Sequence, residues 1–557
     1  MWVGRLLARL SPRDSVPESL RTVSPFLDSD PLLLAKAADS VGIGFVCVLS
    51  AMGVLVGRPS LLLVAVGAGY GATVAVRGAA VAVANARQSR ALGAAPALVS
   101  RAVLRTRIEP TAEAAADFAA GSGGRLGDRL AEHVRRARGT PRSGLGTFAD
   151  AWREVFPALH RSVTLVAAAA AAPPGERDRA LDRAMDAILD GTRTRAVDAA
   201  ESLRGPATAI YAFGVLLPLA LVSVVPAAGA AGVAATLPAI VVIYDLVLPV
   251  GLLCAGGWLL ANRPVVFPPA SIDSARKRHR AVPLAVGGVA GTCGWLLAGL
   301  MVPSWTRPLA ALGIGVGTAL ISHYRPIVTV RKRADELDAA LPDALYLVGR
   351  RVADGVAVER AVAETATELD GVAGTAFESA ARRQRHLRVG VETAFNGEHG
   401  AFESMPSRRA ESVGRLLGVA AESGPPAGRA LIETADHLDS LRRVEEEARR
   451  DLGRVTATLG NTAAFFAPLV GGATVALADN VGTVSTLGGS APETAGLGTA
   501  IGVYVLLLAA ILTVLSTGLS RGLDRATVGY RTGAALCAAT ATYLVAFAAT
   551  GMAAGGL

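Results

Sequence analysis

The side chain with the clearest capacity for chemistry is Asp245, an acid inside a long apolar stretch. Ionisable groups at such positions in membrane proteins usually serve function, because burying them away from water costs free energy. A proton or ion relay at Asp245 would make the protein a secondary transporter. No second acid or base shares the middle of the stretch, so a protonated or hydrogen-bonded carboxyl facing other helices is the simpler interpretation. An aspartyl intramembrane protease would need a second carboxylate, which is not evident.

Other residue types that carry catalysis lack the required spacing. The 7 histidines form no HExxH or paired-ligand motif, and the 4 cysteines form no CxxC motif. None of the three lysines (Lys36, Lys277 and Lys332) follows a glycine or precedes Ser or Thr, so a Walker A element is absent. We therefore expect no enzymatic activity, no cofactor and no metal site. Any nucleotide energy must come from a partner.

Arginine clusters mark the charged segments of the second half. They are Arg350-Arg351, Arg382-Arg383-Gln384-Arg385 and Arg442-Arg443. Such clusters are either solvated helix faces or docking points for an acidic partner. No aromatic residues interleave with them, so stacking on single-stranded nucleic acid is unsupported and we expect no nucleic-acid partner.

The composition places these residues in a polytopic membrane protein. The 557 residues are 52% hydrophobic and only 18% charged, and the mean hydropathy is +0.43. Soluble domains carry about 25% charged residues. The net charge is +9. Basic residues next to membrane spans usually determine orientation, so this charge does not by itself indicate a nucleic-acid partner.

Nine apolar runs approach the roughly 20 residues that an α-helix needs to cross a bilayer. They lie at 37–57, 60–84, 206–226, 234–261, 283–302, 308–323, 457–478, 497–517 and 530–551. GxxxG spacings, which let helix backbones approach closely, occur within three of these runs. The glycine pairs are Gly67/Gly71, Gly287/Gly291 and Gly313/Gly317.

The positions of the basic residues predict the orientation. With the N-terminus inside, the external segments hold only Arg58 and Arg307, and the short 262–282 loop holds five basic residues inside. Nine spans then place the C-terminus outside the plasma membrane. The predicted organisation is an N-terminal cytoplasmic segment (1–36), a span pair (37–84), a cytoplasmic helical domain (85–205), a span pair (206–261), a basic linker (262–282), a span pair (283–323), a second cytoplasmic helical domain (324–456) and three spans (457–557).

The two long cytoplasmic segments read as helical bundles, which makes the fold all-α. Leu337, Leu341 and Leu345 recur at helical spacing in the second segment, and Pro342 among them predicts the first turn of a restarted helix. A later helix from about Ala427 is expected to continue into the span at 457. Movement of the domain would then be coupled mechanically to the membrane helices.

The chain also shows signs of internal duplication. Pro173-Pro174 precedes a charged helix and a span containing Phe213, and Pro425-Pro426 precedes a charged helix and a span containing Phe465. The second double proline follows the first by 252 residues, and Phe465 follows Phe213 by the same number. A repeat of this size in a membrane protein predicts a scaffold with approximate two-fold symmetry.

One segment within this architecture carries a family resemblance. It runs Leu341-Pro342-Asp343-Ala344-Leu345-Tyr346-Leu347-Val348-Gly349-Arg350-Arg351, followed by Gly355 and Val358-Glu359-Arg360-Ala361. This segment resembles the type II secretion system F domain family. The second half resembles the family up to the 457 span. The first half resembles it only through Phe148-Ala149-Asp150-Ala151-Trp152 and the double proline.

The resemblance implies a non-enzymatic membrane platform of a type IV pilus-like or type II secretion-like machine. Its expected partners are a hexameric secretion ATPase on the cytoplasmic side, pilin-like subunits and membrane lipid, and we expect a homo-oligomer, a dimer. Arg350, Arg351, Arg382 and Arg383 are the candidate ATPase contacts. The alternative function is a secondary transporter that uses Asp245.

Overall fold

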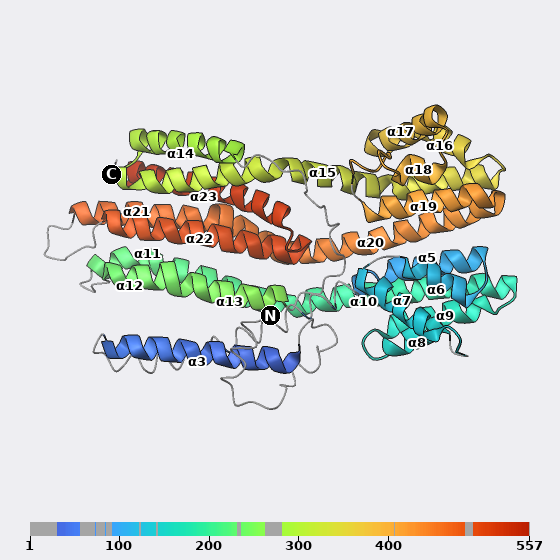
Figure 1. Cartoon of the computed structure of the whole chain (residues 1–557). Helices are drawn as coiled ribbons and strands as arrows, with labels where there is room; N and C mark the ends of the chain where they lie inside the picture. The colour runs from blue at the N-terminus through green and yellow to red at the C-terminus, as the bar shows by residue number, and fades with distance from the viewer. Residues whose placement is uncertain are drawn as a thin grey trace.

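The computed structural model describes residues 30–55, 73, 84, 88, 92–121, 124–140, 143–230, 236–261, 281–405, 407–484 and 494–555. Every regular element in this part of the chain is a helix. Long helices lie side by side in a bundle at one end of the molecule, and shorter helices gather in two groups at the other end (Figure 1). We call these two groups the first and the second module.

Six helices of the described residues are long and apolar enough to cross a membrane. They are Pro174–Val224, Leu237–Leu260, Ala281–Leu300, Thr456–Asn480, Thr494–Arg521 and Arg525–Ala553. Large apolar side chains point outward from them: Leu300 is 83% exposed and Phe213 71% exposed. A helix surface of this kind needs lipid around it, so the chain is a membrane protein.

The other three predicted spans are not among these six helices. The run 37–57 corresponds largely to helix α3 (Pro31–Leu55), which is not among the six. The run 60–84 lies outside the described residues except at Thr73 and Ala84. The run 308–323 is the first part of α15 (Arg307–Ala353), which is also not among the six.

Helix α15 corrects one sequence-based expectation. It continues for 47 residues from the bundle into the second module, with Pro342 inside it rather than at the start of a new helix. An internal proline removes one backbone hydrogen bond and costs roughly 3 kcal/mol. Leu341 and Leu345, on either side of Pro342, are almost fully buried in the core of the second module. Packing on both sides of the proline therefore holds the helix together.

Two further helices connect the modules to the bundle. Helix α10 (Pro174–Tyr211, 38 residues) and helix α20 (Pro425–Asn461, 37 residues) both start in a module. Each continues through a π-helical turn, η2 (Ala212–Leu216) or η5 (Thr462–Phe466), into a bundle helix. The predicted run of the second charged helix into the span at 457 is confirmed.

Each module has its own hydrophobic core. The first module also contains α5 (Ala95–Ile108), α6 (Ala112–Ala120), α7 (Gly124–Ala137), α8 (Gly144–Ala151) and α9 (Pro157–Ala170). The second contains the end of α15, then α16 (Val358–Ala366), α17 (Gly371–Leu387), α18 (Val391–Asn396) and α19 (Arg408–Ser423). Phe148 is fully buried in the first core, and Phe377 and Phe395 meet edge to face in the second, with their ring centroids 5.1 Å apart.

The remaining bundle helices either continue from the π turns or belong to the other spans. They are α11 (Leu217–Ala230), α12 (Leu237–Val241), η3 (Val242–Val247), α13 (Leu248–Ala261), α14 (Ala281–Met301), α21 (Ala467–Val484), α22 (Thr494–Arg521) and α23 (Arg525–Gly555). Helix α15 packs against both α14 and α23.

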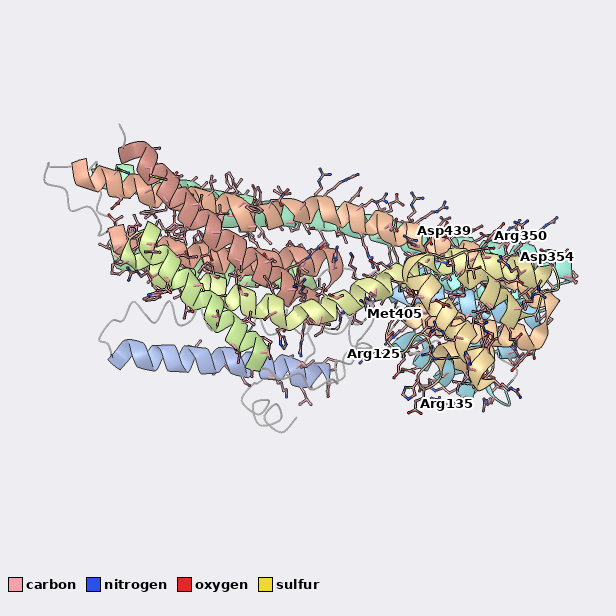
Figure 2. The ribbon with its side chains drawn as sticks, turned by 90° about the horizontal axis from the view of Figure 1, so that it is seen from above. Arg125, Arg135, Arg350, Asp354, Met405 and Asp439 are labelled. Atoms are coloured by element: carbon pink, nitrogen blue, oxygen red, sulfur yellow. The ribbon has the colours of Figure 1, made fainter. Side chains whose placement is uncertain are left out.

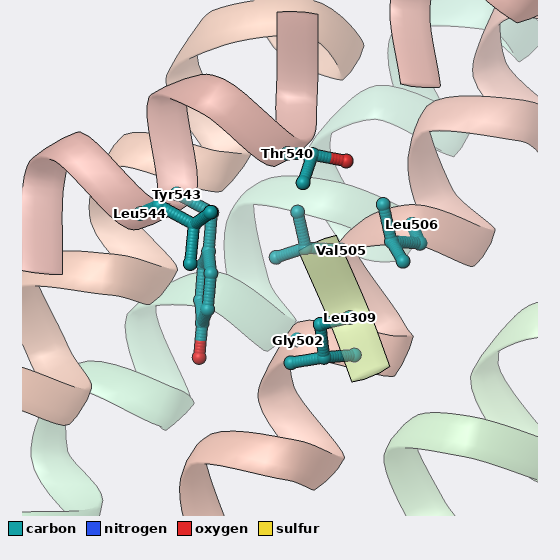
Figure 3. Close-up of a pocket in the computed structure, with 7 residues that line it drawn as sticks. All are labelled: Leu309, Gly502, Val505, Leu506, Thr540, Tyr543 and Leu544. Atoms are coloured by element: carbon teal, nitrogen blue, oxygen red, sulfur yellow. The ribbon is translucent and has the colours of Figure 1, made fainter. Parts of the chain in front are cut away.

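Small residues make these helix contacts possible. A Cβ atom added at Gly287 of α14 would lie 2.7 Å from the carbonyl oxygen of Gly315, and one at Gly313 would overlap Thr540 of α23. Two of the three GxxxG pairs therefore lie at tight helix contacts, and Gly67/Gly71 lies outside the described residues. A small apolar pocket remains between α15, α22 and α23, lined by Leu309, Gly502 and Tyr543 among others (Figure 3).

Candidate functional site

Asp245 lies in the π turn η3 in the membrane bundle. Its side chain is half-buried, and its Oδ1 atom has no hydrogen-bond partner within the described residues. The preceding Tyr244 is anchored: its hydroxyl donates to the Pro218 carbonyl at 3.1 Å, and its ring meets Tyr504 edge to face. The structure thus positions the backbone around Asp245 firmly and leaves one carboxylate oxygen unpaired.

The four candidate arginines differ in their surroundings. Arg351 is only 20% exposed and is used inside the second module. Its guanidinium donates to Glu368 at 2.5 Å and to the Thr365 hydroxyl at 3.2 Å, and it also lies 3.4 Å from Glu364. These contacts tie α15 to α16 and to the residues that follow it. Arg351 is therefore a structural residue of the second module.

Arg350 differs from its neighbour. It is exposed near the C-terminal end of α15, and no ion pair involves it in the described part of the chain. Figure 2 shows Arg350 and Asp354 toward the end of the molecule that lies farthest from the bundle. On α17, Arg382 pairs with Glu378 of the preceding turn at 3.2 Å, and Arg383 donates to the Ser379 hydroxyl. Of the four, Arg350 is the most available to a partner.

A polar seam joins the two modules. Arg107 of α5 is only 11% exposed and pairs with Asp182 of α10 at 2.7 Å and with Glu433 of α20. Further along the same two helices, Arg193 pairs with Glu447 at 2.9 Å. Three helices from both halves of the chain are held together in this way.

Apolar residues and a histidine complete the seam. Leu441 of α20 packs into the core of the first module, and Leu104 of α5 packs into the core of the second. Burial, and secondarily the charge of Arg107, lowers the pKa of His437 below its ordinary value. His437 is therefore neutral at pH 7, and it adds no positive charge beside Arg107.

A second buried network fixes the second module to its connecting helices. The Ser407 hydroxyl donates to Asp338 of α15 and accepts from the backbone N–H of Ala410 at 3.1 Å, which caps α19. Arg409 pairs with Glu445 of α20, whose side chain is 5% exposed. Burial is the main cause that raises the pKa of Asp338 above its ordinary value. The network links α15, α19 and α20 at one place.

Sequence reasoning did not find the seam or this network. Arg107 and Glu433 are far apart in the chain, and nothing in their local sequence distinguishes them from surface charges. The two long helices were recognised as charged, but a charged sequence does not show which residues of the two helices face each other. Among the described residues, no group of three His, Cys, Asp or Glu side chains is arranged to hold a metal ion.

Comparisons with known proteins bring no assignment: no protein-family model, no curated protein and no solved structure matches this chain. The functional conclusion therefore depends on the geometry described above and on the sequence resemblance.

Proposed function

We propose that the protein is an integral membrane platform of a type IV pilus-like or type II secretion-like machine. The observation that carries the proposal is the position of both helical modules at one end of the membrane bundle, with α10, α15 and α20 running from the modules into the bundle (Figure 1). A partner that binds the modules from the cytoplasm can in this way act on helices inside the membrane. The resemblance of the segment around Leu341 to the secretion F domain supports the same function.

The connecting helices suit the transmission of force. An α-helix rises 1.5 Å per residue, so a helix as long as α20 extends over roughly 55 Å. Hydrogen bonds along its length make it stiff. Because Arg107 joins α10 to α20 by pairing with both Asp182 and Glu433, a displacement of one module is passed to both helices. The π turns η2 and η5 lie where each helix enters the bundle, and they are places where a helix can bend.

The same π turns support a duplicated scaffold. η2 begins at Ala212 and η5 at Thr462, 250 residues later, and each follows a long helix that starts at a proline. The paired helices also contact each other, α10 against α20 and α11 against α21. We infer two related halves, nine spans, a cytoplasmic N-terminus, an external C-terminus and a location in the plasma membrane. A homodimer is the proposed assembly.

The far end of the modules is the proposed docking surface for a hexameric secretion ATPase. Arg350 is exposed there, on the helix that leads back into the bundle. Arg382 and Arg383 of α17 are further candidates, whereas Arg351 is engaged inside the second module. The proposed cargo of the bundle is a pilin-like subunit, whose apolar helix would leave the membrane beside the spans.

Co-purification tests this proposal. The full-length protein and its cognate secretion ATPase are co-expressed, and recovery of the ATPase is compared between the wild type and Arg350→Glu. The matched control is Arg443→Glu, an exposed arginine of α20 that pairs with Asp439 of the preceding turn at 2.6 Å. We expect recovery to fall severalfold for Arg350→Glu and to stay unchanged for Arg443→Glu. Failure of the wild type to retain the ATPase would overturn the proposal.

A secondary transporter is the competing function, and the unpaired carboxylate oxygen of Asp245 favours it. A proton or ion relay requires the ionisable carboxyl, whereas a platform requires only a helix of the same shape. Asp245→Asn separates the two functions: it should abolish transport-dependent activity in a transporter and leave filament assembly largely intact in a platform.

A further inference from the structure

Helices α22 and α23 meet in a tight turn at one end of the membrane bundle. Helix α22 ends at Arg521 and α23 begins at Arg525, and both are long and apolar enough to cross a membrane. Gly522, whose φ angle is 93°, reverses the chain between them, and its N–H donates to the Gly518 carbonyl at 3.1 Å. Figure 1 shows that the two helices meet at the end of the bundle that faces the modules.

A third spanning helix ends at the same level. A Cβ atom added at Gly518 would lie 2.6 Å from the side chain of Leu260, where the membrane-spanning segment of α13 ends. The same atom would lie 3.1 Å from Leu523 of the turn. Because three spanning helices end together here, the α22–α23 turn lies at the membrane surface.

Three arginines of this turn and of the start of α23 have no counter-charge. Arg521 and Arg525 are exposed, Arg531 is half-buried, and none of the three forms an ion pair within the described residues. The charge of Arg521 acts on Arg531, so the two guanidinium groups lie near each other. Like charges at this separation repel, and the repulsion is greater where one of them is shielded from water. An anion from outside the chain would relieve it.

The acid of the turn is already engaged elsewhere. Asp524 pairs with Arg331 of α15, and its carboxylate accepts from the N–H of Thr527 at 2.8 Å, which caps the start of α23. Its side chain is only 12% exposed. Asp524 therefore fixes the turn to α15, and the three arginines keep an excess of positive charge.

An apolar side chain lies between two of these arginines in the chain. Leu523 is 59% exposed although it lies next to Gly518. At a membrane surface, an exposed leucine flanked by arginines can contact acyl chains while the guanidinium groups reach the phosphates above them. The turn thus presents both kinds of contact that a phospholipid needs.

We propose that the α22–α23 turn binds the headgroup of an anionic phospholipid through Arg521, Arg525 and Arg531. Guanidinium groups bind phosphate with paired, charge-assisted hydrogen bonds, and basic sites between membrane helices hold anionic headgroups. The bound phosphate offsets the repulsion between Arg521 and Arg531. Because Asp524 ties this turn to α15, the lipid would also stabilise the packing of α23 on the helix that leads into the second module.

Native mass spectrometry of the detergent-solubilised, full-length protein tests the proposal. The protein is titrated with phosphatidylglycerol or phosphatidylcholine, and binding is compared between the wild type and Arg521→Gln with Arg531→Gln. We expect the wild type to bind phosphatidylglycerol severalfold more tightly than phosphatidylcholine, and the double variant to lose this preference. The control is Arg360→Gln with Arg443→Gln, two exposed arginines of the second module, which removes the same charge and should keep the preference. An unchanged preference in Arg521→Gln with Arg531→Gln would overturn the proposal.

Two further measurements keep the result specific. Arg521→Gln alone changes only an exposed side chain, so it carries the test if the double variant does not fold, and it should also weaken phosphatidylglycerol binding severalfold. At equal ionic strength, inorganic phosphate should displace no more phosphatidylglycerol than chloride does. Preferential displacement by phosphate would overturn the proposal and assign the arginines to a soluble anion. None of these results depends on whether a secretion ATPase binds the modules.

Discussion

Single side chains decide how the two modules are joined. Arg107 contacts acids from both halves of the chain, and Asp338 lies in a buried network with Ser407 and Arg409. Removing one charged group in such a place leaves its partner without a counter-charge, and the cost rises with the burial of that partner. These positions are therefore sensitive to substitution, unlike the exposed arginines nearby.

The first prediction concerns Arg107→Ala. Removing the guanidinium leaves Asp182 and Glu433 without their shared cation, so we expect a loss of about 1.5–3 kcal/mol of stability. Thermal unfolding of the detergent-solubilised protein measures the change. Arg443→Ala, whose side chain is 79% exposed, is the control and should change stability by less than about 0.5 kcal/mol. Equal midpoints for the two variants would show that the seam does not stabilise the protein.

The second prediction concerns the pH dependence at Asp338. Its pKa in the folded protein is raised above the ordinary value of 3.8, so folding favours the protonated carboxyl. This contribution to stability is complete below pH 3.8 and is lost as the pH rises through the folded-state pKa. Asp338→Asn, which stays neutral and can still accept from Ser407, should gain stability relative to the wild type as the pH rises from about 4 toward 7. Unfolding midpoints across this range provide the measurement, and a constant difference between the two proteins would contradict it.

Residues with unusual local surroundings were accessible to sequence analysis, and residues with unusual distant partners were not. Asp245 stands out because its neighbours in the chain are apolar, and Arg350 stands out as one of a pair. The different roles of Arg350 and Arg351 depend on which side of α15 faces α16. The sequence does not give the rotation of α15 relative to α16, so it cannot show which of the two adjacent arginines is buried.

At the scale of elements, long helices and small residues define the bundle. Hydrophobic periodicity predicted the helical character of both modules, and the length of the apolar runs predicted most of the spans. Pro342 was predicted wrongly, because its effect on the helix depends on how strongly the residues around it are packed in three dimensions. The continuity of α15 from the bundle into the second module was missed for the same reason.

The third prediction uses two adjacent glycines of α14. A Cβ atom at Gly287 would lie 2.6 Å from Ala319, whereas one at Gly288 would meet nothing within 4 Å. Gly287→Leu should therefore push α14 away from α15 and cost at least about 1–3 kcal/mol, the usual penalty of overpacking. Gly288→Leu changes the same helix by the same side chain and should be nearly neutral. Thermal unfolding in detergent distinguishes them, and equally tolerated substitutions would contradict the packing of α14 on α15.

At the scale of the whole molecule, both modules lie at the same end of one membrane bundle (Figure 1). The sequence indicated this arrangement through the distribution of its basic residues and through its two long charged segments. It could not show that the modules contact each other, because Leu104 and Leu441 resemble any other core leucine until the halves are brought together. The contact matters for a platform, since it makes the two modules a single surface for one partner.

A platform of this kind requires both modules to face the cytoplasm, and cysteine labelling in intact cells tests this most directly. The native cysteines are replaced, and single cysteines are placed at Arg153 in the first module, at Glu398 in the second and at Ser304 in the turn before α15, all of them exposed. A membrane-impermeant maleimide should label only position 304 in intact cells, and positions 153 and 398 only after the membrane is permeabilised. Labelling of either module from outside would contradict the platform.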